Sequence, residues 1–149
     1  MWERTEGWET RLARLIEQAP NVPFAWGTRD CCLWAADGVE ALTARDPAAA
    51  WRGRYGNEEG ALRVLRAVLG ADVHPSRYIE AMAELIASEI GATESTEAFA
   101  RRGDIALLDG PLGRALGVVD LNGRYIVGVT QEGVARVPLA AGLRHWSVG

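Results

Sequence analysis

Apolar and polar residues alternate with two different periods along this chain, and the period changes near residue 103. Before that point, apolar residues recur every three or four positions over 6–19, 31–44, 57–69 and 79–90, which is the spacing of one helix face. After it, short apolar runs between turn residues predict strands at 104–109, 115–121, 124–129, 134–137 and 143–148. The pattern therefore predicts an α+β fold, with helices in about 1–102 and a sheet of about five strands in about 103–149.

The connections between these segments indicate how the strands pair. Asn122 and Gly123 separate two predicted strands by two residues, which is a strong signal for a hairpin. The polar stretch 92–102 is predicted to be a surface connection with one helical turn at 97–100. Since the chain shows no repeat, low-complexity tract or linker, we expect a single domain over 1–149, with the helices packed on one face of an antiparallel meander.

Composition narrows the class of protein. The chain has 149 residues, of which 48% are hydrophobic, so it can bury one substantial core. Its net charge of -4 argues against a nucleic-acid partner, because nucleic-acid binders present a basic stripe to the phosphates. The segment 1–6 is charged and no continuous apolar run follows it, so we expect neither a signal peptide nor a membrane span.

The segment from Phe24 to Asp37 contains both cysteines and joins a loop to a helix. Asp30 is a suitable N-cap, which places Cys31 at the first helical position. Free backbone N–H groups and the positive end of the helix dipole favour a thiolate there. Cys31 is therefore a candidate nucleophile, whereas Cys32 falls on the apolar stripe of the helix and is predicted to belong to the core.

Other interpretations of the two cysteines remain open. Cysteine is among the residues most often buried as a small hydrophobe, so a structural role for Cys31 is the simpler alternative. Two adjacent cysteines are too few for a disulfide framework or a zinc site, and we predict no metal or cofactor. A thiol redox role, or a transient metal shared with a partner chain, is a further hypothesis.

Several motifs resemble one protein family. Trp26-Gly27 shortly before Asp30-Cys31 resembles the NlpC-type branch of the papain-like cysteine peptidases, which are mostly cell-wall endopeptidases and amidases. With 52–55 (Arg-Gly-Arg-Tyr) and 101–104 (Arg-Arg-Gly-Asp), the chain is closer still to NlpC-like proteins of bacteriophage tail modules. The resemblance implies a papain-like fold, with Cys31 at the nucleophile position and Gly103-Asp104 opening the first core strand. It covers about two-thirds of the chain and leaves 71–100 unmatched.

A thiol peptidase also needs a base, and the resemblance implies a histidine at the start of the second strand. The matching position here is Ala115, which cannot accept a proton. The two histidines of the chain are His74, in a turn before a helix, and His145, on a predicted edge strand. His145 is the better substitute, because a last strand can lie close to the second. On the third strand, where an orienting residue is expected, the segment 125–128 offers none, although Gln131 follows in the turn.

The sequence therefore favours an interaction protein over an enzyme. Our first hypothesis is a structural protein of a phage tail, at the tail tip or in its assembly, built on a degenerate NlpC-like domain and bound to other tail proteins. It would be made in the host cytoplasm and carried in the virion. The alternative is an active peptidoglycan endopeptidase in which Cys31 attacks a stem-peptide carbonyl and His145 is the base.

Candidate binding residues follow from the aromatic and basic positions around the cysteine segment. Phe24 and Trp26 are expected either to join the core or to line the cleft beside Cys31. Trp and Arg dominate binding hot spots, so exposed residues of these types are expected to contact partners. The candidates are Trp26, Trp51, Arg52, Arg54 and Tyr55.

Overall fold

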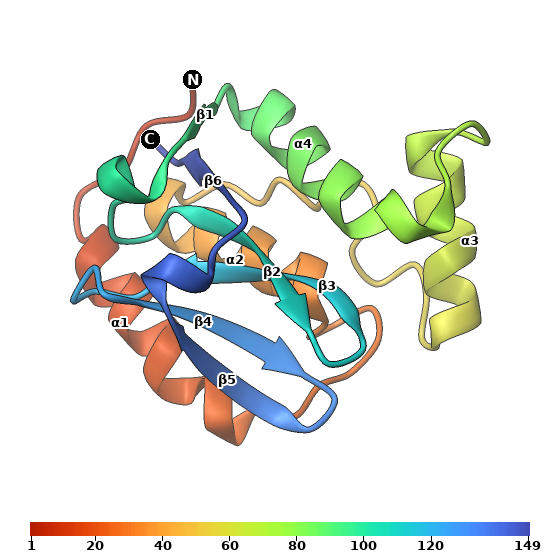
Figure 1. The fold of residues 1–149 in the computed structure, drawn as a ribbon, viewed down its shortest axis with the longest axis horizontal. Coiled ribbons are helices and arrows are strands. Elements are labelled where there is room, and N and C mark those ends of the chain that lie inside the picture. The colour runs from red at the N-terminus through yellow and green to blue at the C-terminus, as the bar shows by residue number, and fades with distance from the viewer.

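The computed structural model describes all residues from Met1 to Gly149. Its four α-helices all lie in the first two-thirds of the chain (Figure 1). They are α1 (Trp8–Gln18), α2 (Cys31–Thr43), α3 (Glu58–Leu69) and α4 (Tyr78–Ile90). Short 3-10 turns are η1 (Ala19–Asn21), η2 (Pro75–Arg77), η3 (Glu97–Phe99) and η4 (Leu139–Ala141). The helices begin and end within a few residues of the predicted bounds. None of them is long and apolar enough to cross a membrane.

Six strands form one sheet in which every neighbouring pair is antiparallel. They are β1 (Thr93–Ser95), β2 (Ile105–Gly110), β3 (Gly113–Val119), β4 (Tyr125–Thr130), β5 (Gly133–Pro138) and β6 (Arg144–Ser147). Their order in the sheet is β1-β6-β2-β3-β4-β5. The α+β class and the antiparallel sheet are thus confirmed, and residues 122 and 123 do form a hairpin turn between β3 and β4.

Two details of the predicted sheet are wrong. The stretch 92–102 contains the short strand β1, which pairs with β6 and makes the sheet six-stranded. Because β1 lies at the sheet edge and is mostly exposed, it has no apolar alternation by which the sequence could reveal it. The second error follows from the first: β6 lies between β1 and β2, so His145 is not on an edge strand.

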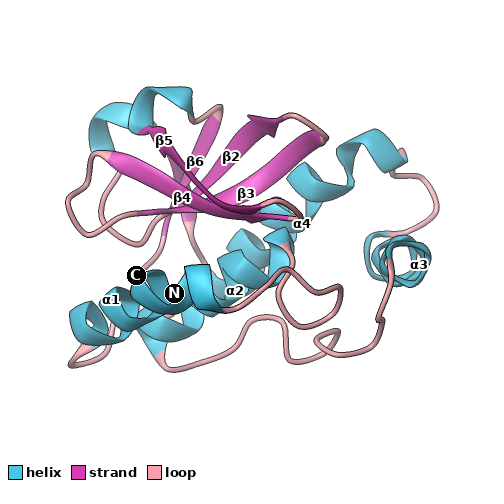
Figure 2. Cartoon of the chain, turned by 90° about the horizontal axis from the view of Figure 1, so that it is seen from below, coloured by secondary structure: helices cyan, strands magenta, loops and turns pink.

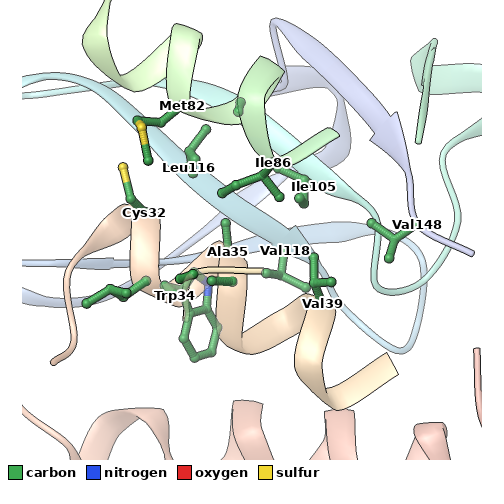
Figure 3. Packing of buried hydrophobic residues seen from close by; sticks show 14 of the residues in the cluster. Cys32, Trp34, Ala35, Val39, Met82, Ile86, Ile105, Leu116, Val118 and Val148 are labelled. Atoms are coloured by element: carbon green, nitrogen blue, oxygen red, sulfur yellow. The ribbon is translucent and has the colours of Figure 1, made fainter. Parts of the chain in front are cut away.

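The helices and the sheet form two layers with the main core between them (Figure 2). Helix α2 lies at the centre of this core, and ten of its thirteen residues are buried. The Trp34 indole is fully buried and donates a hydrogen bond to the carbonyl of Val127 on β4 at 2.8 Å. Figure 3 shows Cys32 and Met82 pointing toward one another, with Leu116 of β3 beside them. The sheet therefore fixes the position and direction of α2.

A smaller apolar cluster lies on the sheet face turned away from α2. It consists of Ala106, Leu108, Val119 and Ile126, with Leu139 of η4 packed against it. Since cross-strand partners point to the same face of a sheet, His145, which pairs with Ala106, belongs to this second face. Helix α3 is peripheral: it packs on α4 and projects beyond the sheet (Figure 1).

A matched pair of substitutions on α4 tests the layering. Met82 is fully buried between α4 and the sheet, whereas Leu85 on the same helix is 37% exposed. We expect Met82→Ala to lower the free energy of unfolding by about 2–5 kcal/mol. Leu85→Ala should cost less than about 1 kcal/mol. Urea denaturation of both variants measures this, and equal losses would contradict the arrangement.

Candidate functional site

The N-terminus of α2 is fixed by the carboxylate of Asp30. The backbone N–H of Leu33 donates to Oδ1 at 3.0 Å, which is the predicted N-cap, and the N–H of Gly27 donates to Oδ2 at 3.1 Å. The Tyr55 hydroxyl also donates to Oδ2, at 2.5 Å. Cys31 is therefore the first helical residue, as predicted. Its backbone is positioned by the three hydrogen bonds that the carboxylate of the preceding residue, Asp30, accepts.

The turn at Gly27 brings the loop 51–55 against this cap. Gly27 has a φ of 83°, and a Cβ there would lie 1.9 Å from the carbonyl oxygen of Tyr55. The N–H of Gly53 donates to the Gly27 carbonyl at 3.0 Å. Only glycine tolerates both this dihedral angle and this close approach. The Trp26-Gly27 motif is thus a packing requirement that places the loop 51–55 beside the cysteine helix.

The two cysteines have different environments. Cys32 is buried in the core, as predicted, while Cys31 is partly exposed. A hydrogen bond from the Cys32 thiol lowers the pKa of Cys31, burial opposes this effect, and a backbone hydrogen bond from Leu116 of β3 supports it. The same bond to Cys31, together with burial, raises the pKa of Cys32. The charge of Asp30 also raises the pKa of both thiols, but the net pKa of Cys31 is below its ordinary value and that of Cys32 is well above it.

Cys31 opens into a cleft of about 640 Å³ between α3 and the tips of two hairpins. One wall is formed by α3, with Glu58, Leu62 and Leu65 among its residues. The opposite wall is formed by 110–115 of the β2–β3 hairpin and 129–132 of the β4–β5 hairpin, and Phe24 and Trp26 also line the cleft. Of the two places expected for these aromatics, the structure puts both in the lining of the cleft. This volume is in the range of small-molecule sites.

The hairpin tips diverge at the cleft (Figure 1). The pairing of β2 with β3 continues to the tip at Gly110 and Gly113, and that of β4 with β5 continues to Thr130 and Gly133. The pairing of β3 with β4, however, ends at Gly117 and Gly128. We call this opening between the two hairpins the fork. It extends from residue 117 toward Gly113 on β3 and from residue 128 toward Thr130 on β4.

Neither histidine lines the cleft. His145 is 3% exposed, and both of its ring nitrogens lack hydrogen-bond partners. Its neighbour on β2 is Ala106, which lies four residues from the hairpin tip at Gly110. That separation is roughly 13 Å along a strand. His145 is therefore not placed to act on Cys31, because it faces the small cluster behind the sheet.

His74 is exposed and has a local role. Its Nδ1 accepts from the backbone N–H of Ser76 at 3.1 Å and lies 2.7 Å from the Ser76 hydroxyl, so the ring caps η2. Ala115, at the position where the resemblance implies a histidine, does line the cleft, as does Gln131. The structure thus brings together Cys31, Ala115 and Gln131, but no imidazole.

The predicted binding residues separate into two groups. Trp26 lines the cleft, and Arg54 is exposed and makes no ion pair. Trp51, in contrast, is only 4% exposed and belongs to the main core, so its prediction as an exposed contact is wrong. The reason is local: the 46–51 turn is capped by Asp46, whose Oδ1 accepts from the N–H of Ala48 at 2.8 Å, and it directs the indole inward.

Arg52 and Tyr55 are engaged within the chain. Arg52 pairs with Asp37 of α2 and with Asp46, each at 2.8 Å, and Arg29 approaches Asp37 at 3.5 Å. The Tyr55 hydroxyl is bound to Asp30. These side chains therefore hold the loop 51–55 on α2 rather than offering charge or hydroxyl groups to a partner.

Several cleft residues were not predicted from the sequence. Leu62 and Leu112 are 46% and 80% exposed and lie on opposite walls, and Tyr78 is 5% exposed with no hydrogen bond to its hydroxyl. The exposed leucine in the turn 110–113 was the available signal, because such turns are usually polar. No three His, Cys, Asp or Glu side chains come together in a way that could hold a metal ion.

Residues 3–148 match a family described as a domain of unknown function, DUF6950. The chain belongs to this family. The match includes the cap, the cleft and the whole sheet of the DUF6950 domain, so these features are parts of one family unit. No curated protein matches the chain.

Alkylation kinetics test the asymmetry between the two thiols of this DUF6950 chain. Iodoacetamide should modify Cys31 with a pH midpoint below the ordinary cysteine value of about 8.5, because the Cys32 thiol and backbone N–H groups stabilise its thiolate. Cys32→Ala should raise that midpoint, and Cys31→Ala should abolish modification of the folded protein. A midpoint in the wild type at or above that of a cysteine peptide would contradict this description.

Because His145 is buried, we expect the stability of the fold to decrease in mild acid. Burial lowers the pKa of His145, with Glu97 and Asp104 partly opposing the effect. Its folded-state pKa thus lies below the unfolded value of about 6.5, so the unfolded state binds more protons and stability falls as the pH drops from 7 to 5. Urea unfolding of His145→Leu should show a smaller fall over this range, while the exposed His74→Asn control should follow the wild type.

Proposed function

We propose that this chain is an interaction domain of a bacteriophage tail, at the tail tip or in tail assembly. In this proposal it is built on an NlpC-type papain-like domain that lacks its catalytic base, and its partners are other tail proteins. The observation that carries the proposal is that Cys31 opens into a substantial cleft at which no imidazole lies. The arrangement of a cysteine-bearing helix packed on an antiparallel sheet supports the implied fold.

The cleft lacks the groups that peptide hydrolysis requires. A base must take the thiol proton and return it to the leaving amine, and its loss costs about two to four orders of magnitude in rate. Ala115 cannot titrate, and Gln131 can orient a group but cannot accept a proton at neutral pH. Binding of a ligand in the cleft does not require a catalytic base, because it depends on the walls of the cleft and on the helix N-terminus, and both are formed.

The walls of the cleft support a binding role. Leu62 and Leu112 expose large apolar side chains on opposite sides, with Trp26 and Phe24 also lining the cleft. Apolar side chains that remain exposed around a concave site are typical of surfaces that a partner covers. A partner that fills the cleft would remove these side chains from water.

The alternative function is a peptidoglycan endopeptidase with Cys31 as the nucleophile. One observation favours it: the hydrogen bond from Cys32 and the backbone hydrogen bond from Leu116 lower the pKa of Cys31, which supplies thiolate without a neighbouring base. Backbone N–H groups at the start of α2 could then stabilise an oxyanion. This mechanism still lacks a group to protonate the leaving amine.

An assay on purified peptidoglycan separates the two functions. We expect the wild type and Cys31→Ala to release no fragments above background, with an NlpC-type peptidase that has an intact Cys-His pair as the positive control. Release by the wild type but not by Cys31→Ala would overturn the proposal in favour of the enzyme.

A second experiment tests the location. In particles purified from the phage or induced prophage that encodes this chain, mass spectrometry should detect the chain in assembled tails or in tail-assembly intermediates. If the chain is absent from both and tails assemble normally without its gene, the tail function is wrong.

A further inference from the structure

A second hollow, of about 390 Å³, lies at the end of the sheet opposite the cleft. Strand β2 separates the two, since it begins beside this hollow and ends at the hairpin tip that lines the cleft. The two ends of β2 lie well apart in Figure 1. We call this hollow the arginine pocket. The residues that line it are Arg4, Trp8, Ala100, Arg101, Arg102 and Gly123.

The buried carboxylate of Asp104 fixes the walls of the arginine pocket. It accepts hydrogen bonds from the backbone N–H groups of Arg101 at 2.8 Å and Val148 at 3.0 Å, and from the Arg4 guanidinium at 3.3 Å. Arg4 also donates to the Val148 carbonyl at 2.8 Å. One carboxylate therefore joins three distant parts of the chain and holds the backbone of Arg101 and the side chain of Arg4 in place.

The motif at 101–104 (Arg-Arg-Gly-Asp) has two parts with different roles. Gly103 has a φ of 87°, and a Cβ there would lie 2.7 Å from a core leucine, so the turn requires glycine. The side chains of Arg101 and Arg102 are exposed and form no hydrogen bond within the turn. Arg101 donates to the Gly149 carbonyl at 2.7 Å, and Arg102 forms neither a side-chain hydrogen bond nor an ion pair. The turn therefore explains the glycine and the aspartate but not the two arginines.

Positive charge accumulates at the arginine pocket. The guanidinium carbons of Arg4 and Arg102 lie 4.5 Å and 5.0 Å from the centre of the Trp8 ring, within the range of cation–π contacts. Of the three arginines in the lining, only Arg4 is paired with a carboxylate. The chain as a whole has a net charge of -4, so this concentration of cations is opposite in sign to the protein's average.

The arginines repel one another across the pocket. Burial lowers the pKa of Arg4, and the charges of Asp104 and Glu9 oppose this effect. The charges of Arg101 and Arg102 lower this pKa further. Because like charges at short range destabilise one another, an anion that enters the pocket would relieve this repulsion.

The free donors of the pocket determine which anion fits. The guanidinium groups of Arg101 and Arg102 have free N–H groups, and such groups pair with carboxylates through two parallel hydrogen bonds. Phosphate sites usually add a concave set of free backbone N–H groups. In this lining, several backbone N–H groups already donate within the chain, namely those of Ala100, Arg101 and Gly123. The donor set therefore favours carboxylates over a phosphate group.

We propose that the arginine pocket binds an acidic segment of a partner protein, in which two neighbouring aspartate or glutamate carboxylates pair with Arg101 and Arg102. These are the two guanidinium groups of the pocket that have no carboxylate partner in the chain. Arg4 adds positive charge while it stays bound to Asp104. The inference concerns a different surface from the cleft, and it holds whether or not the domain belongs to a phage tail.

Defined peptides provide the test. The probe is the acetylated and amidated hexapeptide Gly-Ala-Glu-Glu-Ala-Gly, titrated into the ¹⁵N-labelled protein. The indole N–H signal of Trp8 and the backbone amide signal of Arg102 should shift. The matched peptide with two glutamines in place of the glutamates should produce no such shifts. Binding of the glutamate peptide should weaken at high salt, because the pairing is exposed to solvent.

Protein variants locate the site. Arg101→Gln and Arg102→Gln should each weaken binding of the glutamate peptide about two- to fivefold, the range expected for an exposed ion pair. Arg66→Gln is the matched control, because Arg66 on α3 is also exposed and makes no ion pair but lies outside the pocket. It should leave binding unchanged. All three variants change exposed side chains, and urea unfolding confirms that each remains folded.

Three results would overturn the inference: no binding of the glutamate peptide, equal binding of the glutamate and glutamine peptides, or equal effects of Arg102→Gln and Arg66→Gln. Inorganic phosphate is titrated as a second probe at the same ionic strength. If phosphate bound more tightly than the glutamate peptide and shifted the same signals, the pocket would be a phosphate site and the acidic-segment inference would be wrong. None of these results bears on the cleft, whose function the peptidoglycan assay tests separately.

Discussion

The structure around the cleft depends on the carboxylate of Asp30. It accepts hydrogen bonds from Leu33, Gly27 and Tyr55, which belong to the helix, the preceding turn and the following loop. A buried carboxylate is stable only when its oxygens are satisfied, so these segments are held together by one group. The cap therefore determines both the start of α2 and the position of Cys31 within the fold.

Cys31 lies at the point where helix α2 meets strand β3. The backbone of Leu116 on β3 helps to lower the pKa of Cys31, and the pairing of β3 with β4 ends at the next residue, Gly117. Cys31 therefore lies where the helix layer meets β3, beside the fork. In a peptidase this position would serve covalent chemistry, because an imidazole would face the sulfur. Here the same geometry leaves a partly exposed thiol beside the apolar walls of the cleft, with no imidazole in the lining.

The sequence predicted much of this arrangement from local rules. The N-cap at Asp30, the burial of Cys32 and the hairpin at 122–123 all depend on residues close together in the chain, and all three are confirmed. The sequence does not reveal strand β1, because its three residues are mostly exposed and owe their conformation to pairing with β6. The burial of Trp51 cannot be read from the sequence, because an aromatic residue beside arginines has the same local pattern whether it faces a partner or the core.

The sequence alone determined the α+β class, the helix that carries Cys31, and the absence of a histidine at position 115, since these follow from periodicity, capping and residue identity. Only the tertiary structure decided that His145 faces the rear of the sheet, that Arg52 and Tyr55 are used internally, and that β3 and β4 diverge beside the sulfur. Each of these depends on contacts between residues far apart in the chain. Local propensities do not encode such contacts, because packing and register arise only when the layers meet.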